Sequence, residues 1–89
     1  MKNSTNDKSE KNDKLWEDAE AELKIHARAL GLAPGASEIF IKKSLNAAQK
    51  SLKNRRIILR ADLTRTVSKE LKKYNADLAY VFENYDKII

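Results

Sequence analysis

Few residues in this 89-residue sequence are suited to chemistry. There is one histidine, His26, and no cysteine, which excludes disulfides, zinc–thiolate sites and thiol nucleophiles. A metal site at His26 would need further ligands at suitable spacing, and the neighbouring sequence supplies none. We therefore interpret His26 as a boundary residue beside an apolar stripe, with a satisfied hydrogen bond. Trp16, the only tryptophan, is predicted to be a core or rim aromatic.

Other routes to catalysis are equally poorly supported. Asp18 and Glu22 lie four residues apart and share a helix face, but other acidic residues surround them, as on a solvated surface. The two glycines, Gly31 and Gly35, belong to one turn and form no phosphate-binding loop. No serine stands in a nucleophile-elbow motif. We predict that the protein is not an enzyme and that it uses no metal or cofactor.

Positive charge is concentrated in the middle of the chain. Residues 39–73 carry 11 basic and 2 acidic side chains, whereas residues 1–38 and 74–89 each have a net charge of −2. Such a block suits an acidic protein, nucleic acid or an anionic membrane surface, and it also suits a well-solvated pair of helices. The charge alone does not choose among these alternatives.

The basic block contains the helix around which we expect the fold to be organised, residues 54–73. Apolar residues recur at every fourth position and two more widen the stripe, which predicts one buried face: Leu59, Leu63, Val67 and Leu71, with Ile58 and Ala61. Basic side chains occupy most of the remaining surface of this predicted helix.

Three further helices follow from the same periodicity. The first is predicted from Asp13, as N-cap, to Leu30, where Gly31 ends it. The second is predicted from Ser37 to about Lys53, with a break at Asn54 and a very short connection rather than one continuous helix. The fourth follows Asn75, which either ends the third helix or caps the fourth.

These elements predict an all-α fold, an antiparallel up-down-up-down four-helix bundle. Residues 1–12 are polar and are predicted to form a flexible tail, and residues 13–89 to form the bundle domain. The polar N-terminus is not a signal peptide, and no run approaches the roughly 20 apolar residues of a membrane span. We expect a soluble cytoplasmic protein.

Three segments carry a resemblance to a known family: SLNAAQKSLKN, RIILRADL and YNADLAYVFENYDKI. Together they resemble the second half of the pediocin-like (class IIa) bacteriocin immunity proteins of lactic-acid bacteria. The matching positions are 46–54, 56–63 and 75–88. The first predicted helix matches only in being amphipathic.

The resemblance implies a non-enzymatic protein that protects the cell producing a bacteriocin. Members of this family act in the cytosol where the bacteriocin engages its membrane receptor, the mannose phosphotransferase permease, and they prevent pore opening. We expect a monomer, with peripheral contact to the anionic inner face of the membrane as a further option. The residues expected to contact the partner are Lys42, Lys43, Lys50, Arg55, Arg56, Arg60, Arg65, Lys69, Lys72, Tyr74 and Tyr80.

Two other functions remain open at this point. A small basic helical DNA-binding or regulatory protein would use the same cations to neutralise phosphates, and its duplex binding would weaken steeply with salt. An adaptor or subunit of a larger assembly would expose an apolar stripe and tend to dimerise. Tyr85 is expected to pack in the core or at its rim in any of these cases.

Overall fold

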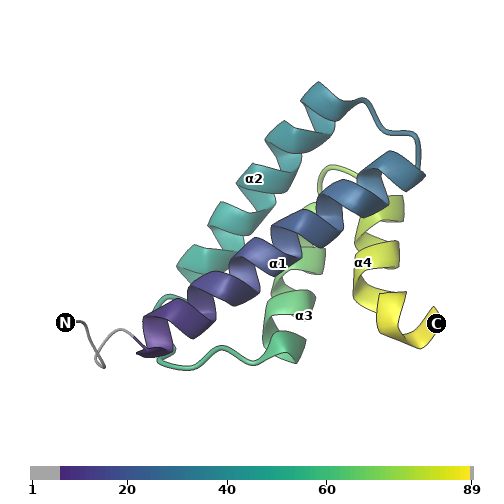
Figure 1. Cartoon of the computed structure of the whole chain (residues 1–89). Coiled ribbons are helices and arrows are strands. Elements are labelled where there is room, and N and C mark those ends of the chain that lie inside the picture. The colour runs from purple at the N-terminus through teal and green to yellow at the C-terminus, as the bar shows by residue number, and fades with distance from the viewer. Residues whose placement is uncertain (1–6, 89) are drawn as a thin grey trace.

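The computed structural model describes the backbone of residues 7–88 and the side chains of residues 12–85. This part of the chain forms four helices, α1 (Asp7–Ala29), α2 (Pro34–Ser51), α3 (Arg60–Leu71) and α4 (Ala76–Ile88). Consecutive helices run antiparallel, with α1 and α2 as a long hairpin and α3 and α4 as a shorter one (Figure 1). Each helix packs on the next, and α4 returns to contact α1. The predicted all-α four-helix bundle is confirmed.

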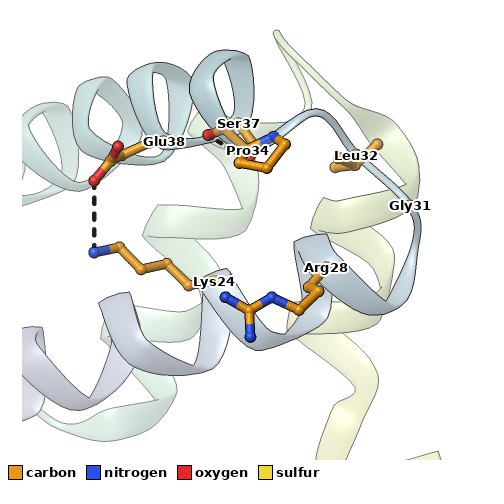
Figure 2. Close-up of a pocket in the computed structure, with 7 residues that line it drawn as sticks. All are labelled: Lys24, Arg28, Gly31, Leu32, Pro34, Ser37 and Glu38. Carbon is orange, nitrogen blue, oxygen red and sulfur yellow. Dashed lines mark hydrogen bonds and ion pairs between the residues drawn. The ribbon is translucent and has the colours of Figure 1, made fainter.

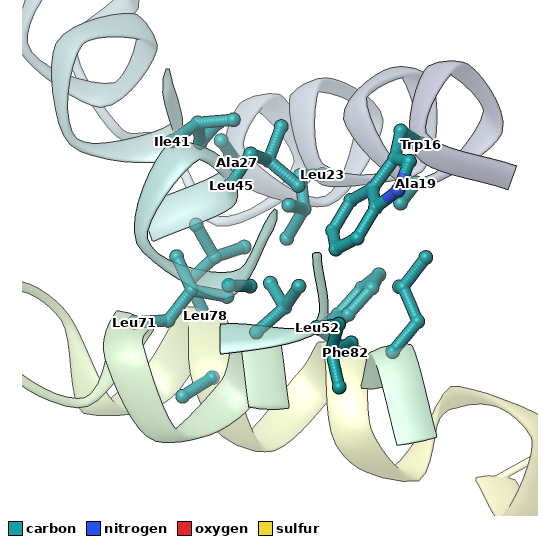
Figure 3. Close-up of a cluster of buried hydrophobic side chains, with 14 of the residues drawn as sticks. Trp16, Ala19, Leu23, Ala27, Ile41, Leu45, Leu52, Leu71, Leu78 and Phe82 are labelled. Atoms are coloured by element: carbon teal, nitrogen blue, oxygen red, sulfur yellow. The ribbon is translucent and has the colours of Figure 1, made fainter. Parts of the chain in front are cut away.

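The core confirms most of the predicted apolar stripes. Leu63, Val67 and Leu71 of α3 are fully buried, and so are Leu23 of α1 and Leu78 of α4. In Figure 3, Trp16, Leu52 and Phe82 fill one end of this core, while Ile41, Leu71 and Leu78 fill the other. All four helices therefore contribute to a single apolar cluster.

The turn after α1 has the geometry that its glycine predicts. Gly31 has a positive φ of 77°, and its amide donates to the carbonyl of Arg28 at 3.0 Å. The amide of Leu32 donates to the carbonyl of Ala27, also at 3.0 Å. These two bonds are those of a Schellman motif, which satisfies carbonyls left free at the helix end.

The start of α2 differs from the prediction. The helix begins at Pro34, with Ala33 as an N-cap that makes no side-chain bond. Proline suits the first helical position, because its φ is already helical and the missing N–H would have no partner there. Ser37, the predicted N-cap, is buried inside the first turn instead, and its hydroxyl donates to the carbonyl of Pro34 at 3.2 Å.

The start of α1 also differs. Helix α1 begins at Asp7, so residues 7–12 of the predicted flexible tail are helical and Asp13 is an interior residue. Residues 1–6 of that predicted tail lie outside the described residues. A long-range contact helps to explain the extra turns, because the Asn12 side chain bonds to the segment between α2 and α3. The sequence around Asn12 does not reveal this partner.

The predicted break between α2 and α3 is confirmed, but the connection is longer than predicted. Residues 52–59 separate the helices, and α3 begins at Arg60 rather than at Asn54. We call residues 52–59 the α2–α3 connection. Within it Leu52 and Ile58 are buried, whereas Leu59, predicted as part of the core stripe, is 61% exposed. The fourfold spacing therefore predicted a core position for Leu59, but Leu59 lies just before the first residue of α3.

The turn between α3 and α4 uses Asn75 as an N-cap. The side-chain oxygen of Asn75 accepts the amide of Leu78 at 2.9 Å, which satisfies one of the free donors at the start of α4. The prediction left open whether Asn75 ends α3 or caps α4. In the structure, Asn75 caps α4.

Candidate binding surface

The net charges of the helices divide the bundle into two pairs. Positive charge is concentrated on α2, the α2–α3 connection and α3, whereas α1 and α4 each carry a net negative charge. Because α2 packs on α3 and α1 packs on α4, like charges lie on neighbouring helices. We call the exposed cations of the first pair and its connection the basic surface. They are Lys42, Lys43, Lys50, Lys53, Arg55, Arg56, Arg65, Lys69 and Lys72.

Acidic groups on this pair of helices are already engaged. Glu38 pairs with Lys24 of α1, and Glu70 pairs with Lys73. Asp62 accepts Arg55 at 2.7 Å and lies 3.6 Å from Arg65.

Most of the cations remain available. Among the described side chains, seven cations of the basic surface form no ion pair: Lys42, Lys43, Lys50, Lys53, Arg56, Lys69 and Lys72. This surface therefore keeps a positive field that a negatively charged partner can neutralise.

Helix geometry fixes where the outward cations point. On α2, Lys43 and Lys50 are seven residues apart, so they lie on one face, opposite the buried Ile41 and Ala48. On α3, Arg65 and Lys69 share the outer face in the same way, and Lys72 follows as the C-cap of this helix. Lys42 lies nearer to α1 and lines a groove with Glu17 and Glu20. The cations thus do not form one flat cluster.

Arg60 does not belong to this surface, contrary to the prediction. Its guanidinium makes two bonds to the Glu22 carboxylate of α1, Nη2 to Oε1 at 2.6 Å and Nη1 to Oε2 at 3.2 Å. Nε donates to the Thr64 hydroxyl at 3.0 Å. The same group lies 5.4 Å from the centre of the Phe82 ring. Arg60 therefore links α3 to α1 and α4.

The predicted tyrosine anchors are separated from each other. Tyr74, in the turn after α3, stacks on Phe40 of α2, with ring centroids 5.9 Å apart and planes 7° apart. Tyr74 therefore adjoins the basic α2–α3 pair. Tyr80 is exposed on α4, one of the two acidic helices. Only Tyr74 is placed to act together with the basic surface.

Sequence reasoning missed two exposed apolar residues beside the basic surface. Ile57 and Leu59 are exposed in the α2–α3 connection, on either side of the buried Ile58. Their signal was present in the sequence as Arg55–Arg56 followed by three aliphatic residues. The predicted helical stripe assigned Leu59 to the core and gave Ile57 no role.

His26 is buried, but its hydrogen bonding differs from the prediction. Nε2 has no partner among the described residues. The imidazole packs against Tyr85 of α4 instead, with ring centroids 4.7 Å apart and a tilt of 48°. Tyr85 is partly exposed, so it closes the rim of the core as predicted. No group of His, Cys, Asp and Glu within the described residues is arranged to hold a metal.

A cavity of about 410 Å³ lies where α1 turns into α2. Lys24 extends from α1 to within 3.8 Å of Glu38 on α2, and Arg28 of α1 also lines the cavity (Figure 2). The only hydroxyl in the lining, that of Ser37, already bonds to a backbone carbonyl. The residues described around this cavity offer charge, but they do not pair a nucleophile with a base.

Comparison with protein-family models, curated proteins and solved structures found no match to this chain. Within residues 7–88, no helix has both the length and the apolar character needed to cross a membrane.

Proposed function

We propose that this protein is a bacteriocin immunity protein that acts by binding rather than by catalysis. One observation carries the proposal: cations that pair with none of the described side chains collect on two neighbouring helices and their connection, while the acids of the same helices are engaged in ion pairs. Such a surface selects negatively charged partners and speeds their association. The resemblance to the pediocin-like immunity family names the partner, and the four-helix fold agrees with it.

In this proposal the protein works in the cytoplasm, at the inner face of the membrane. The basic surface meets acidic cytosolic segments of the mannose phosphotransferase permease when a bacteriocin is bound, and the contact prevents the pore from opening. Tyr74, which adjoins the surface, supplies an aromatic anchor of the kind that dominates many interfaces. The protein acts as a monomer and needs no cofactor.

A growth-inhibition assay tests the proposal. A sensitive strain that expresses the gene is challenged with a panel of pediocin-like bacteriocins, and we expect protection against one or a few of them. The variant Lys43→Glu/Lys50→Glu/Lys69→Glu reverses three exposed cations that pair with no side chain of residues 12–85, and it is expected to remain folded but to lose protection. Arg28→Glu, on the acidic helix α1, is the matched control and is expected to protect normally.

Absence of protection across the panel would refute this proposal. The alternative, duplex DNA binding, draws on the same unpaired cations. It predicts an affinity that falls linearly on a logarithmic salt scale, with a slope that decreases in the triple variant. A salt series with a duplex of random sequence therefore separates the two functions.

A further inference from the structure

The α2–α3 connection exposes two aliphatic side chains that the fold does not use. Ile57 is 60% exposed and Leu59 is 61% exposed, while Ile58 between them is 7% exposed. Leu59 has extended backbone angles, φ −81° and ψ 144°. Because Ile58 faces the core and the side chains on either side of it are exposed, Ile57 and Leu59 both point away from the core.

These residues are presented by a segment that is held at both ends. Leu52 and Ile58 are buried in the core. The side-chain amide of Asn12 donates to the carbonyl of Arg56 at 3.0 Å, and its oxygen accepts the amide of Ile58 at 3.3 Å. In Figure 1 the connection passes the N-terminal part of α1 and lies at one end of the molecule. The connection is therefore fixed to α1 while Ile57 and Leu59 remain exposed.

The surroundings of the apolar pair are cationic. The connection contains Lys53, Arg55 and Arg56 and no acidic residue, and Lys50 precedes it in the last turn of α2. Arg55 is partly neutralised by Asp62, but Lys53 and Arg56 have no ion-pair partner among the described side chains. One acidic residue of α1, Asp13, lines a groove together with Lys53, Arg55 and Ile58.

We propose that the α2–α3 connection docks on an anionic lipid surface. Ile57 and Leu59 enter the boundary between headgroups and acyl chains, and Lys50, Lys53 and Arg56 contact the lipid phosphates. Two outward aliphatic residues beside cations favour a lipid surface over nucleic acid. A lipid surface has an apolar acyl-chain region beneath its phosphates, whereas a solvated nucleic-acid backbone has no such region. This inference deepens the proposed function by giving the protein its own contact with the membrane.

Sedimentation with lipid vesicles tests the inference on the full-length protein. Vesicles of equal parts phosphatidylglycerol and phosphatidylcholine are compared with vesicles of phosphatidylcholine alone. We expect binding to the anionic vesicles that weakens as salt is raised, and little binding to the neutral ones. The assay needs neither bacteriocin nor receptor, so its failure is distinguishable from a failure of the immunity proposal.

Variants separate the apolar contribution from the charge. Ile57→Ser/Leu59→Ser is expected to lower vesicle affinity by about tenfold or more, given that each buried methylene contributes about fourfold. Lys53→Gln/Arg56→Gln is expected to lower it by about fivefold per charge. Ile25→Ser is the matched control, because Ile25 is 64% exposed on the acidic helix α1. Its affinity is expected to equal that of the unmodified protein.

Circular dichroism melting shows whether each variant is folded, and exposed positions are expected to tolerate serine. Three results would overturn the inference. The first is failure of the unmodified protein to bind anionic vesicles. The second is full vesicle affinity in folded Ile57→Ser/Leu59→Ser, which would show that the exposed aliphatic side chains of the connection do not contribute to binding. The third is an equal loss of affinity in Ile25→Ser, which would show that the site is not specific.

Discussion

Arg60 provides the sharpest test of how the charges are divided between folding and binding. We compare two substitutions by methionine, Arg60→Met and Lys69→Met, which keep an apolar stem and remove the charge. Arg60 is bonded to Glu22 and Thr64 and lies over Phe82. Lys69 is exposed on the same helix and forms no ion pair with the described residues. Only the first substitution is expected to destabilise the fold.

The magnitude follows from the contacts of the guanidinium. The two-bonded ion pair with Glu22, at a partly exposed site, contributes about 1 kcal/mol to the stability of the fold. The hydrogen bond to Thr64 and the contact with Phe82 contribute about 0.5 kcal/mol each. A cation at a helix N-terminus is unfavourable by about 0.5 kcal/mol, and this part is regained when Arg60 is replaced. The net loss is about 1.5 kcal/mol, which lowers Tm by about 6 to 12 °C in a domain of this size.

Thermal melting followed by circular dichroism measures both variants. Lys69→Met is expected to change stability by less than about 0.5 kcal/mol, as is usual for surface positions. A double-mutant cycle with Glu22→Gln isolates the pair and is expected to give a coupling of about 1 kcal/mol. If Arg60→Met melts within about 2 °C of Lys69→Met, or the coupling is zero, the structural role assigned to Arg60 is wrong.

Three other predictions concern the core and the turns. Val67→Asp places an unpaired charge at a fully buried position and is expected to abolish the helical circular dichroism signal; a folded variant would show that α3 packs by a different face. Ser44→Ala and Ser68→Ala remove buried hydroxyls that have no partner among the described residues, so each is expected to stabilise the protein by about 1 kcal/mol; a lower Tm would reveal a hydrogen bond at that hydroxyl. Gly31→Ala is expected to cost about 1 kcal/mol, because φ is 77° there, whereas Gly35→Ala, with open space at its Cβ in the first turn of α2, should be neutral or stabilising; equal Tm values would contradict this.

Periodic patterns predicted the helices well because they depend on neighbouring residues. The spacing of Leu63, Val67 and Leu71 placed them in the core, where the structure finds them fully buried. Gly31 and Asn75 were predicted to stand at helix ends because their local backbone and side-chain chemistry suits those positions, and both do. Apolar spacing and helix-end residues of this kind depend on only a few neighbouring residues.

Helix ends without such a signal were predicted less well. Ser37 has the side chain of an N-cap, but Pro34 begins α2 three residues earlier and buries that serine in the first turn. Leu59 continues the fourfold spacing of α3, yet it lies before the helix. Periodicity alone does not distinguish an apolar residue on a helix from one in the adjoining extended segment, because both satisfy the same spacing over one turn.

Composition and spacing in the sequence determined the all-α class, the number of helices, most of the core and the concentration of positive charge in residues 39–73. Tertiary structure decided which charges are paired across the bundle. Arg60 lies 38 residues from Glu22, and Asn12 lies 44 to 46 residues from its partners in the α2–α3 connection. These contacts engage the guanidinium of Arg60 within the fold and fix the segment in which Ile57 and Leu59 are exposed. Pairings across such separations depend on how the helices pack, and local sequence patterns do not encode them.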